Sequence, residues 1–210
     1  MSGAFSGAVA FFVNGGFFMI LLLLLSLSAG TIMLLRALAL RERLILPADL
    51  ERAIVNLQPG EPMEHLLREA ERNSSPLARI ASVCLSHLNW SRQENIEAVQ
   101  VCARHEVVRM ESGMSTLEMT TGVAPLLGLL GTLSGLVAVF AALGSGVSGA
   151  DPVAVARGIA EALNTTIVGL AVAVPSLVAH SYFQRKIETM AVSMEGLIAD
   201  LLAKCYPERP

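Results

Sequence analysis

Three long runs of apolar residues dominate the chain. The first, residues 11–35, includes FFMILLLLLSLSAGTIMLL and carries no charge, and two further runs cover residues 119–143 and 153–183. About 20 apolar residues are enough for an α-helix to cross the roughly 30 Å hydrocarbon core of a bilayer. The pattern therefore predicts an all-α membrane protein with three transmembrane helices.

A secretory signal peptide is the alternative interpretation of the first run. No basic segment precedes that run, its apolar stretch is too long for a signal peptide, and no clear small-residue cleavage site lies before Arg36. We therefore expect residues 11–35 to remain in the protein as a membrane span.

The polar segment between the first two spans, residues 36–118, shows helix starts and helical periodicity. Ser75, directly before a proline, predicts one helix start, and Ser91 with Glu94 forms a capping box that predicts another. Apolar positions at helical spacing follow each start: Leu77, Ile80, Ala81, Cys84, Leu85 and Leu88, then Ile96, Val99, Ala103, Val107, Met110, Met114 and Leu117. Since no proline interrupts the second series before Pro125, it predicts a helix that enters the membrane without a break.

The third apolar run is predicted to continue well beyond the membrane. Asp151 and Pro152 suit the N-cap and first helical position, and no strong stop follows before about Leu202. Such a helix would be roughly 75 Å long at 1.5 Å per residue, more than twice the bilayer core. Past residue 183 an apolar stripe persists at Ile187, Met190, Met194, Leu197, Ile198 and Leu201. We expect residues 184–210 to project into the cytoplasm and pack there.

Basic residues predict the orientation of the spans. Residues 1–10 carry no charge, whereas Arg36, Arg41 and Arg43 follow the first span at once. The positive-inside rule therefore places the N-terminus in the periplasm. The other segments then alternate, with residues 36–118 and 184–210 in the cytoplasm and the loop 144–152 in the periplasm.

Composition supports a membrane protein and excludes several functional classes. Hydrophobic residues make up 53% of the chain and charged residues 16%, with a mean hydropathy of +0.59, which is too apolar for an ordinary soluble domain. The net charge of −3 gives no indication of nucleic-acid binding. Cys84, Cys102 and Cys205 lack metal-site spacing, so free thiols are expected. The sequence predicts no metal, no cofactor and no enzymatic activity.

Polar residues crowd the first half of the third span, which begins GIAEALNTTIVGL at Gly158. An ionisable residue inside a membrane segment indicates a functional site, so Glu161 and its neighbours Thr165 and Thr166 are candidates. Thr132 in the second span lies about as deep as Thr166, roughly 18 to 21 Å from the outer loop, so the two threonines are expected to meet.

Two purely structural alternatives stay open for these residues. Threonine in a membrane helix often donates only to its own backbone at position i−4. Arg157 precedes Glu161 by one helical turn, so the two side chains can form an ion pair that only stabilises the helix.

Small residues in the second span predict close helix packing. Gly131 and Gly135 form a G-x-x-x-G motif, and Gly128 precedes them by one turn. This spacing lets membrane helices approach closely, within or between subunits. We assign the same packing role to Pro125, Gly169 and Pro175.

Two segments resemble a known family: APLLGLLGTLSGL at residues 124–136 and GIAEALNTTIVGLAVAVPSLVAHSYFQRKI at residues 158–187. They are similar to the MotA/TolQ/ExbB proton-channel family. Three spans with an outside N-terminus look like its ExbB/TolQ branch, since MotA-like stators have four. The resemblance implies a homopentameric ring in the bacterial inner membrane, surrounded by lipid.

The resemblance also implies partners and residue roles. A dimer of a single-span ExbD- or TolR-like protein would occupy the central pore and bring a proton-carrying aspartate, and a TonB- or TolA-like protein would span the periplasm. Thr132 and Thr166 would line the pore and proton path together with Glu161, the family's glutamate, and Thr165 beside them.

These observations lead to one main hypothesis and three rivals. The main one is a proton-channel or motor subunit that uses the proton motive force to energise TonB-dependent outer-membrane transport. A TolQ-like envelope-maintenance or gliding-type motor subunit is the second. A purely structural membrane oligomer is the third, and a small-solute transporter, weakened by the lack of internal repeats, is the fourth.

Overall fold

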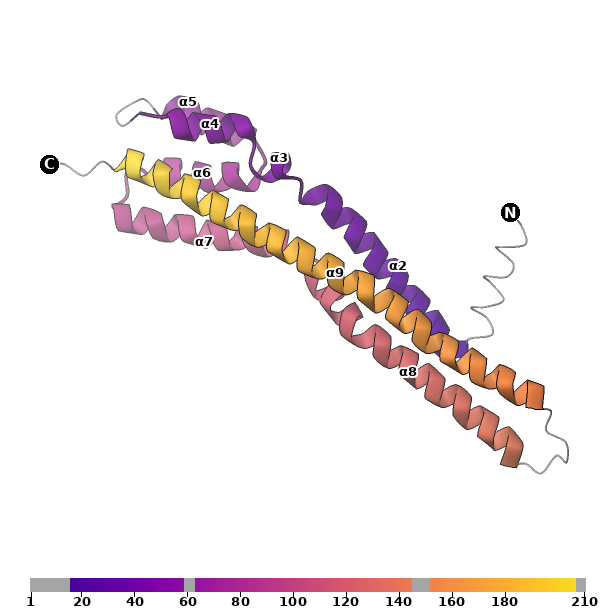
Figure 1. Cartoon of the computed structure of the whole chain (residues 1–210). Helices are drawn as coiled ribbons and strands as arrows, with labels where there is room; N and C mark the ends of the chain where they lie inside the picture. The colour runs from indigo at the N-terminus through magenta and orange to yellow at the C-terminus, as the bar shows by residue number, and fades with distance from the viewer. Residues whose placement is uncertain (1–15, 59–62, 145–151, 207–210) are drawn as a thin grey trace. The chain divides into compact units, whose positions relative to one another are not determined.

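The computed structural model describes residues 16–58, 63–144 and 152–206 of the 210-residue chain. These ranges are helical, without a strand among them (Figure 1). The predicted N-terminal segment 1–10, the start of the first span and nearly all of the predicted loop 144–152 lie outside the described residues.

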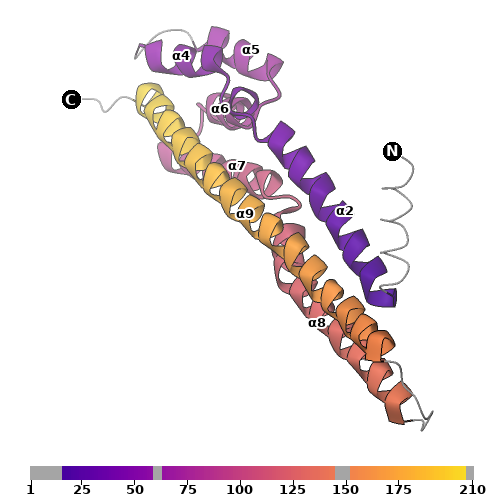
Figure 2. The same cartoon turned by 45° about the vertical axis from the view of Figure 1, so that its right-hand side comes forward.

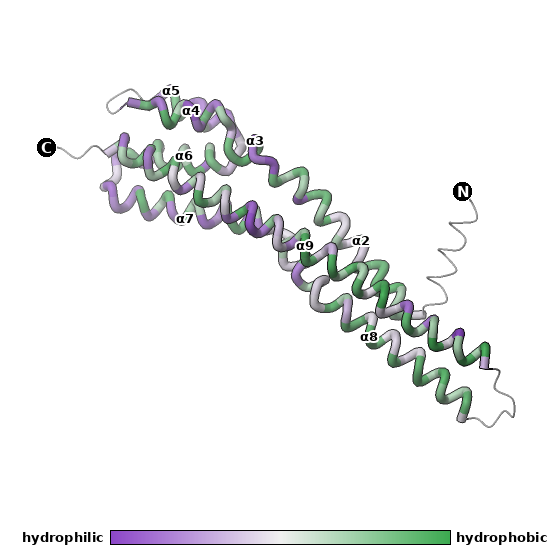
Figure 3. Tube along the Cα trace, in the orientation of Figure 1, coloured by the Kyte–Doolittle hydropathy of each residue, from purple (hydrophilic) through white to green (hydrophobic). Residues whose placement is uncertain are grey.

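Three helices are long and apolar enough to cross a membrane: α2 (Gly16–Ala39), α8 (Met114–Gly144) and α9 (Pro152–Cys205). Apolar positions dominate α2 and α8 in the hydropathy colouring of Figure 3. The prediction of an all-α membrane protein with three spans is therefore confirmed. The orientation of the spans stays a prediction.

The chain divides into two compact units. Among the described residues, the first comprises those within 16–34 and 113–181, and the second comprises those within 35–112 and 182–206. Both α2 and α9 contribute residues to each unit. In the first unit, α8 and α9 run side by side (Figures 1 and 2). Leu22 of α2 joins Ala124 of α8 and Ala173 of α9 in a buried apolar cluster, so all three spans meet there.

The second unit contains α3 (Glu42–Ile45), α4 (Ala48–Asn56), α5 (Glu64–Arg72), α6 (Pro76–Ser86) and α7 (Arg92–Met110). Both predicted helix starts are confirmed. The Ser75 hydroxyl accepts a hydrogen bond from the backbone N–H of Ala78 at 3.2 Å, and Ser91 and Glu94 form the reciprocal bonds of a capping box. The predicted stripe of α6 is buried at all positions except the half-buried Leu88. The stripe at the C-terminal end of α9 is buried except at the half-buried Leu197.

The prediction that one helix runs from residue 92 into the membrane is wrong. The helix α7 ends at Met110 and α8 begins at Met114. Gly113 between them has a φ of +81°, a left-handed conformation that side chains disfavour and that commonly ends helices. The apolar spacing does not reveal this break because Met110, Met114 and Leu117 are all buried on the two sides of it.

The helix α9 extends over 54 residues without interruption. This confirms the prediction that the third span continues as one helix past residue 183. The Pro175 ring removes one backbone donor, and the helix continues through it. The helix α9 therefore contributes buried residues to the cores of both units.

Two polar side chains of α7 are buried, which the sequence pattern did not indicate. Glu106 is 4% exposed and receives hydrogen bonds from Arg79 of α6 at 2.8 Å and from Arg109 at 3.2 Å. Burial raises the pKa of the Glu106 carboxyl, but the two arginines lower it by more, so that the pKa lies below its ordinary value. Asn95 is fully buried and donates to the backbone oxygen of Cys84 at 2.9 Å. These contacts join α6 to α7.

Candidate functional site

The candidate site begins with glycines that let α8 and α9 approach closely. A Cβ atom added at Gly128 would lie 2.9 Å from the backbone oxygen of Thr165. One added at Gly131 would lie 2.7 Å from the Thr165 hydroxyl oxygen. Real Cβ atoms do not approach other atoms so closely, so the Thr165–Thr166 segment occupies the space that glycine leaves on α8.

The same close contact extends in both directions along the helix pair. A Cβ at Gly135 would meet the Ala162 side chain at 2.7 Å, and one at Gly169 would meet the backbone oxygen of Ala124 at 2.6 Å. All four predicted packing glycines therefore lie at the contact of α8 with α9 in one subunit. Of the two prolines assigned to the same role, Pro125 is half-buried and Pro175 is exposed.

Three threonine hydroxyls meet at this close contact of the two helices. Thr132 and Thr166 share a hydrogen bond between their hydroxyls, and Thr165 lies 3.4 Å from Thr132, oxygen to oxygen. Each of the three hydroxyls is 3.1 Å from the backbone oxygen of Gly128. Thr132 also contacts the backbone oxygen of Ala162 at 3.0 Å, and Thr165 contacts it at 2.7 Å. We call Thr132, Thr165 and Thr166 the threonine cluster.

The sequence prediction that Thr132 and Thr166 meet at one level agrees with this geometry. The purely structural alternative for threonine is also met, because the Thr132 hydroxyl is within hydrogen-bond distance of the backbone oxygen of Gly128, four residues earlier in its own helix. Thr132 and Thr165 are buried between the helices, with exposed fractions of 8% and 3%, whereas Thr166 is half-buried. Thr166 is therefore the most exposed member of the cluster in this chain.

Each hydroxyl carries one proton but has several acceptors within reach. A hydroxyl can donate one hydrogen bond and accept two, so the cluster permits more than one pattern of donors and acceptors with the same heavy-atom positions. Such a group can accept and pass on a hydrogen bond. It contains no group that titrates near neutral pH, so proton release and uptake require a carboxyl or imidazole from elsewhere.

Glu161 bonds to a residue outside this cluster, although it lies one turn before Thr165 on the same helix face. Its carboxylate accepts a hydrogen bond from Arg157 at 3.0 Å, which forms the predicted i,i+4 ion pair. The side chains are 42% and 74% exposed, respectively. Five residues separate Glu161 from Thr166, which turns their side chains about 140° apart on an α-helix. Within one subunit, Glu161 and Thr166 therefore point in different directions.

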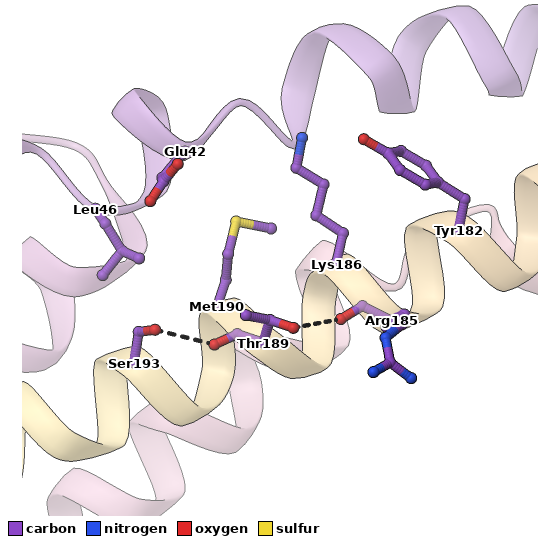
Figure 4. A pocket seen from close by; sticks show the side chains of 8 residues that line it. All are labelled: Glu42, Leu46, Tyr182, Arg185, Lys186, Thr189, Met190 and Ser193. Carbon is purple, nitrogen blue, oxygen red and sulfur yellow. Dashed lines mark hydrogen bonds between the residues drawn. The ribbon is translucent and has the colours of Figure 1, made fainter.

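A groove of about 310 Å³ lies in the second unit, along the part of α9 that follows the apolar run (Figure 4). Arg185 and Lys186 line it, and the Lys186 ammonium lies 5.9 Å from the centre of the Tyr182 ring. The Thr189 and Ser193 hydroxyls donate to backbone oxygens of α9 at 2.9 and 3.1 Å. The groove is lined by two basic residues and by the acidic Glu42, and its Thr189 and Ser193 hydroxyls are engaged by their own helix.

No group of three or more His, Cys, Asp or Glu side chains that could hold a metal ion occurs within the described ranges. The three cysteines are unpaired. The threonine cluster is a polar contact between α8 and α9, and it is built from hydroxyl groups and backbone oxygens.

Comparison with known proteins gives a consistent result. Residues 62–196 match the MotA/TolQ/ExbB proton channel family, and this range includes the threonine cluster and the packing glycines. A biopolymer transport protein ExbB homolog of Methanothermobacter thermautotrophicus is 33% identical over 165 residues, 70% of this chain and 58% of the relative.

Two bacterial relatives show similar likeness. An ExbB-like biopolymer transport protein of Synechocystis is 35% identical over 79% of this chain and 66% of its own length. The biopolymer transport protein ExbB of Neisseria gonorrhoeae is 30% identical over 60% of this chain and 64% of its own length. The matched part thus spans less than two thirds of each of these relatives.

Proposed function

The chain belongs to the MotA/TolQ/ExbB proton channel family, and from this premise we propose that it is an ExbB-type energising subunit of a bacterial inner-membrane complex. It uses the proton motive force to drive TonB-dependent outer-membrane transport. A family match over the spans and several relatives named for biopolymer transport support this proposal. A proton that crosses about 100 mV releases about 2.3 kcal/mol, which is the energy available to each step.

The observation that carries the proposal is the threonine cluster. Thr132 and Thr166 bring two hydroxyls from different spans to one level of an otherwise apolar helix pair. In a ring of subunits, the half-buried Thr166 and its partner Thr132 form a polar step in the wall of a central pore. Glu161 and Thr165 belong to the same proton path, Glu161 through its contacts with a neighbouring chain.

The threonine cluster lacks a titrating group, which supports a role for a second protein. Because three hydroxyls cannot take up or release a proton near neutral pH and Glu161 points away from Thr166, we infer that the carboxyl that exchanges protons with the cluster comes from another chain. We assign it to a single-span ExbD- or TolR-like dimer inside a homopentamer. A TonB- or TolA-like protein that spans the periplasm then receives the motion. The N-terminus lies in the periplasm and the C-terminus in the cytoplasm.

The ring also needs surfaces through which subunits and lipid meet. Large apolar side chains of α8 and α9 are exposed in the single chain, among them Leu129, Val137, Phe140, Ile167 and Val174. Burying such side chains against neighbours or lipid is favourable. These faces supply the contacts between subunits and with the bilayer.

Proton flux into liposomes tests the proposal. The chain is purified with a co-expressed single-span ExbD- or TolR-like protein, and a voltage is imposed across the liposome membrane. The Thr132→Val/Thr166→Val double variant, which keeps the side-chain shape, is expected to lose most partner-dependent flux. Thr31→Val is the matched control, since Thr31 is exposed on α2 and donates only to Leu27 of its own helix.

The rival functions predict other outcomes. Full flux in the double variant would remove the threonine cluster from the proton path. A purely structural oligomer would show no partner-dependent flux with any variant. A TolQ-like subunit would conduct protons in the same way but would support envelope integrity in cells and leave TonB-dependent uptake unchanged.

A further inference from the structure

The groove along α9 carries opposite charges on two elements of the second unit. Glu42 is the first residue of the short helix α3, and Lys186 lies on α9. Figure 4 shows the two side chains with Met190 between them in this view. No ion pair of Glu42 or Lys186, with each other or with another residue, occurs within residues 16–58, 63–144 and 152–206. The groove therefore offers one carboxylate and one ammonium that a ligand can neutralise.

The groove also offers hydrogen-bond acceptors. The Thr189 hydroxyl donates its proton to the backbone oxygen of Arg185, and the Ser193 hydroxyl donates its proton to the backbone oxygen of Thr189. A hydroxyl that has donated its one proton can still accept two hydrogen bonds. Together with the Glu42 carboxylate, the two hydroxyls therefore suit a group that carries several N–H donors, such as a primary ammonium.

The exposed side chains of α9 change in character towards the groove. Val174, Val178 and Tyr182 follow one another at intervals of one helical turn, and all three are exposed. Lys186 follows by one further turn, and its ammonium lies 5.9 Å from the centre of the Tyr182 ring. Tyrosine is enriched where a membrane helix meets water, and lysine side chains there extend towards the polar layer. The groove therefore begins where the apolar run of the third span ends.

We propose that this groove binds the headgroup of a phospholipid that carries both a phosphate and a primary ammonium, as in phosphatidylethanolamine. Lys186 contacts the phosphate. The lipid ammonium donates hydrogen bonds to the Glu42 carboxylate and to the two hydroxyls on α9. All the residues that line the groove belong to the second unit, so the headgroup joins α3 to α9 within that unit.

The charges of the groove favour this headgroup over other phospholipids. A headgroup with a phosphate and no ammonium, as in phosphatidylglycerol, places its negative charge beside Glu42 without compensation. The quaternary ammonium of phosphatidylcholine has no N–H to donate. Arg185 also lines the groove, but its guanidinium points away from Glu42 in Figure 4. Lys186 is therefore the cation that we assign to the phosphate.

Native mass spectrometry of the full chain in detergent tests the proposal. Delipidated protein is titrated with phosphatidylethanolamine, phosphatidylglycerol or phosphatidylcholine that carry the same acyl chains. One phosphatidylethanolamine per chain is expected to be retained, with an apparent affinity about tenfold above that of the other two. Equal retention of the three lipids, or tighter binding of phosphatidylglycerol, would overturn the proposal. Displacement of the lipid by soluble glycerophosphoethanolamine at equal concentration would overturn the lipid as the ligand.

Charge variants test the two contacts separately. Glu42→Gln should remove the preference for phosphatidylethanolamine over phosphatidylglycerol. Lys186→Gln should weaken the binding of both lipids about tenfold, and Lys186→Arg should restore most of it. Arg43→Gln is the matched control, because it removes an exposed positive charge from α3 at a position that does not line the groove. An unchanged preference in Glu42→Gln, or equal losses in Arg43→Gln and Lys186→Gln, would contradict the assigned contacts.

Discussion

Thr132 of α8 and Thr166 of α9 lie 34 residues apart in the sequence, and their hydroxyls share a hydrogen bond between the two helices. Polar contacts of this kind between membrane helices contribute about 0.6 kcal/mol on average and up to about 1.7 kcal/mol. The contact therefore has a modest energy, and its role in the proposed proton path is to position the Thr166 hydroxyl.

The shared hydrogen bond predicts non-additive mutations. Thr132→Val and Thr166→Val are each expected to lower the free energy of unfolding by about 0.5 to 1.5 kcal/mol. The double variant should lose about 0.6 kcal/mol less than the sum, because the shared bond is lost only once. Unfolding in mixed micelles by added detergent measures all four proteins, and strict additivity would show that the two hydroxyls do not interact.

Close helix contact predicts a sharp difference between glycines. Gly128→Ala puts a Cβ 2.9 Å from a backbone oxygen of α9, whereas a Cβ at Gly122 meets nothing within 4 Å. We expect Gly128→Ala to destabilise the protein by about 1 to 3 kcal/mol through overpacking. Gly122→Ala, on the same helix, should be neutral or stabilising by up to about 1 kcal/mol. Equal effects in the same micelle assay would contradict the packing seen here.

The Glu106 carboxyl predicts a loss of stability in acid. Its pKa is lowered overall by Arg79 and Arg109 despite burial, so the folded state binds its proton less readily than the unfolded state. Its contribution is complete above the ordinary glutamate pKa of about 4.3. That contribution disappears as the pH falls through the lower folded value.

Glu106→Gln should therefore flatten the pH dependence of the thermal midpoint between about pH 5 and pH 3. The variant should also cost about 1 to 3 kcal/mol at pH 7, because it weakens two charged hydrogen bonds. Glu97→Gln on the exposed side of the same helix is the control. A pH profile of Glu106→Gln identical to that of the unmodified protein would refute the assignment.

Variants of the Arg157–Glu161 ion pair are predicted to fold normally and yet to differ in proton flux. An exposed i,i+4 ion pair contributes less than about 1 kcal/mol, so Arg157→Gln and Glu161→Gln should both fold and assemble. In the liposome assay, Glu161→Gln is expected to reduce partner-dependent proton flux by about a hundredfold. Arg157→Gln should reduce it only slightly. If both variants reduce flux equally, the pair acts as one structural unit.

Local and periodic features of the structure could be predicted from the sequence. The spans, the capped starts at Ser75 and Ser91, and the unbroken α9 depend on neighbouring residues and on spacing along one helix. The contact of Thr132 with Thr166 could be predicted because both residues lie at a similar distance from the loop that connects the second and third spans. The glycines indicated a close approach, because close packing of membrane helices requires small side chains.

Features that depend on distant partners could not be predicted in this way. The buried Glu106 carboxylate accepts a hydrogen bond from Arg79, 27 residues away. The buried Asn95 amide donates a hydrogen bond to the hydroxyl of Tyr206, 111 residues away. Polar residues in a helical pattern are otherwise assigned to the exposed face. The break at Gly113 escaped detection because the apolar spacing continues on both sides of it.

That break gives the spans different mechanical properties. The chain between α7 and α8 passes through a turn at Gly113, where the regular helical hydrogen bonds of the two helices stop. The helix α9 has no such turn over its 54 residues, although Pro175 leaves one backbone donor missing. A force applied at Thr165 and Thr166 would therefore act on one continuous helical backbone in α9, whereas a force applied to α8 would meet a turn before it reached α7.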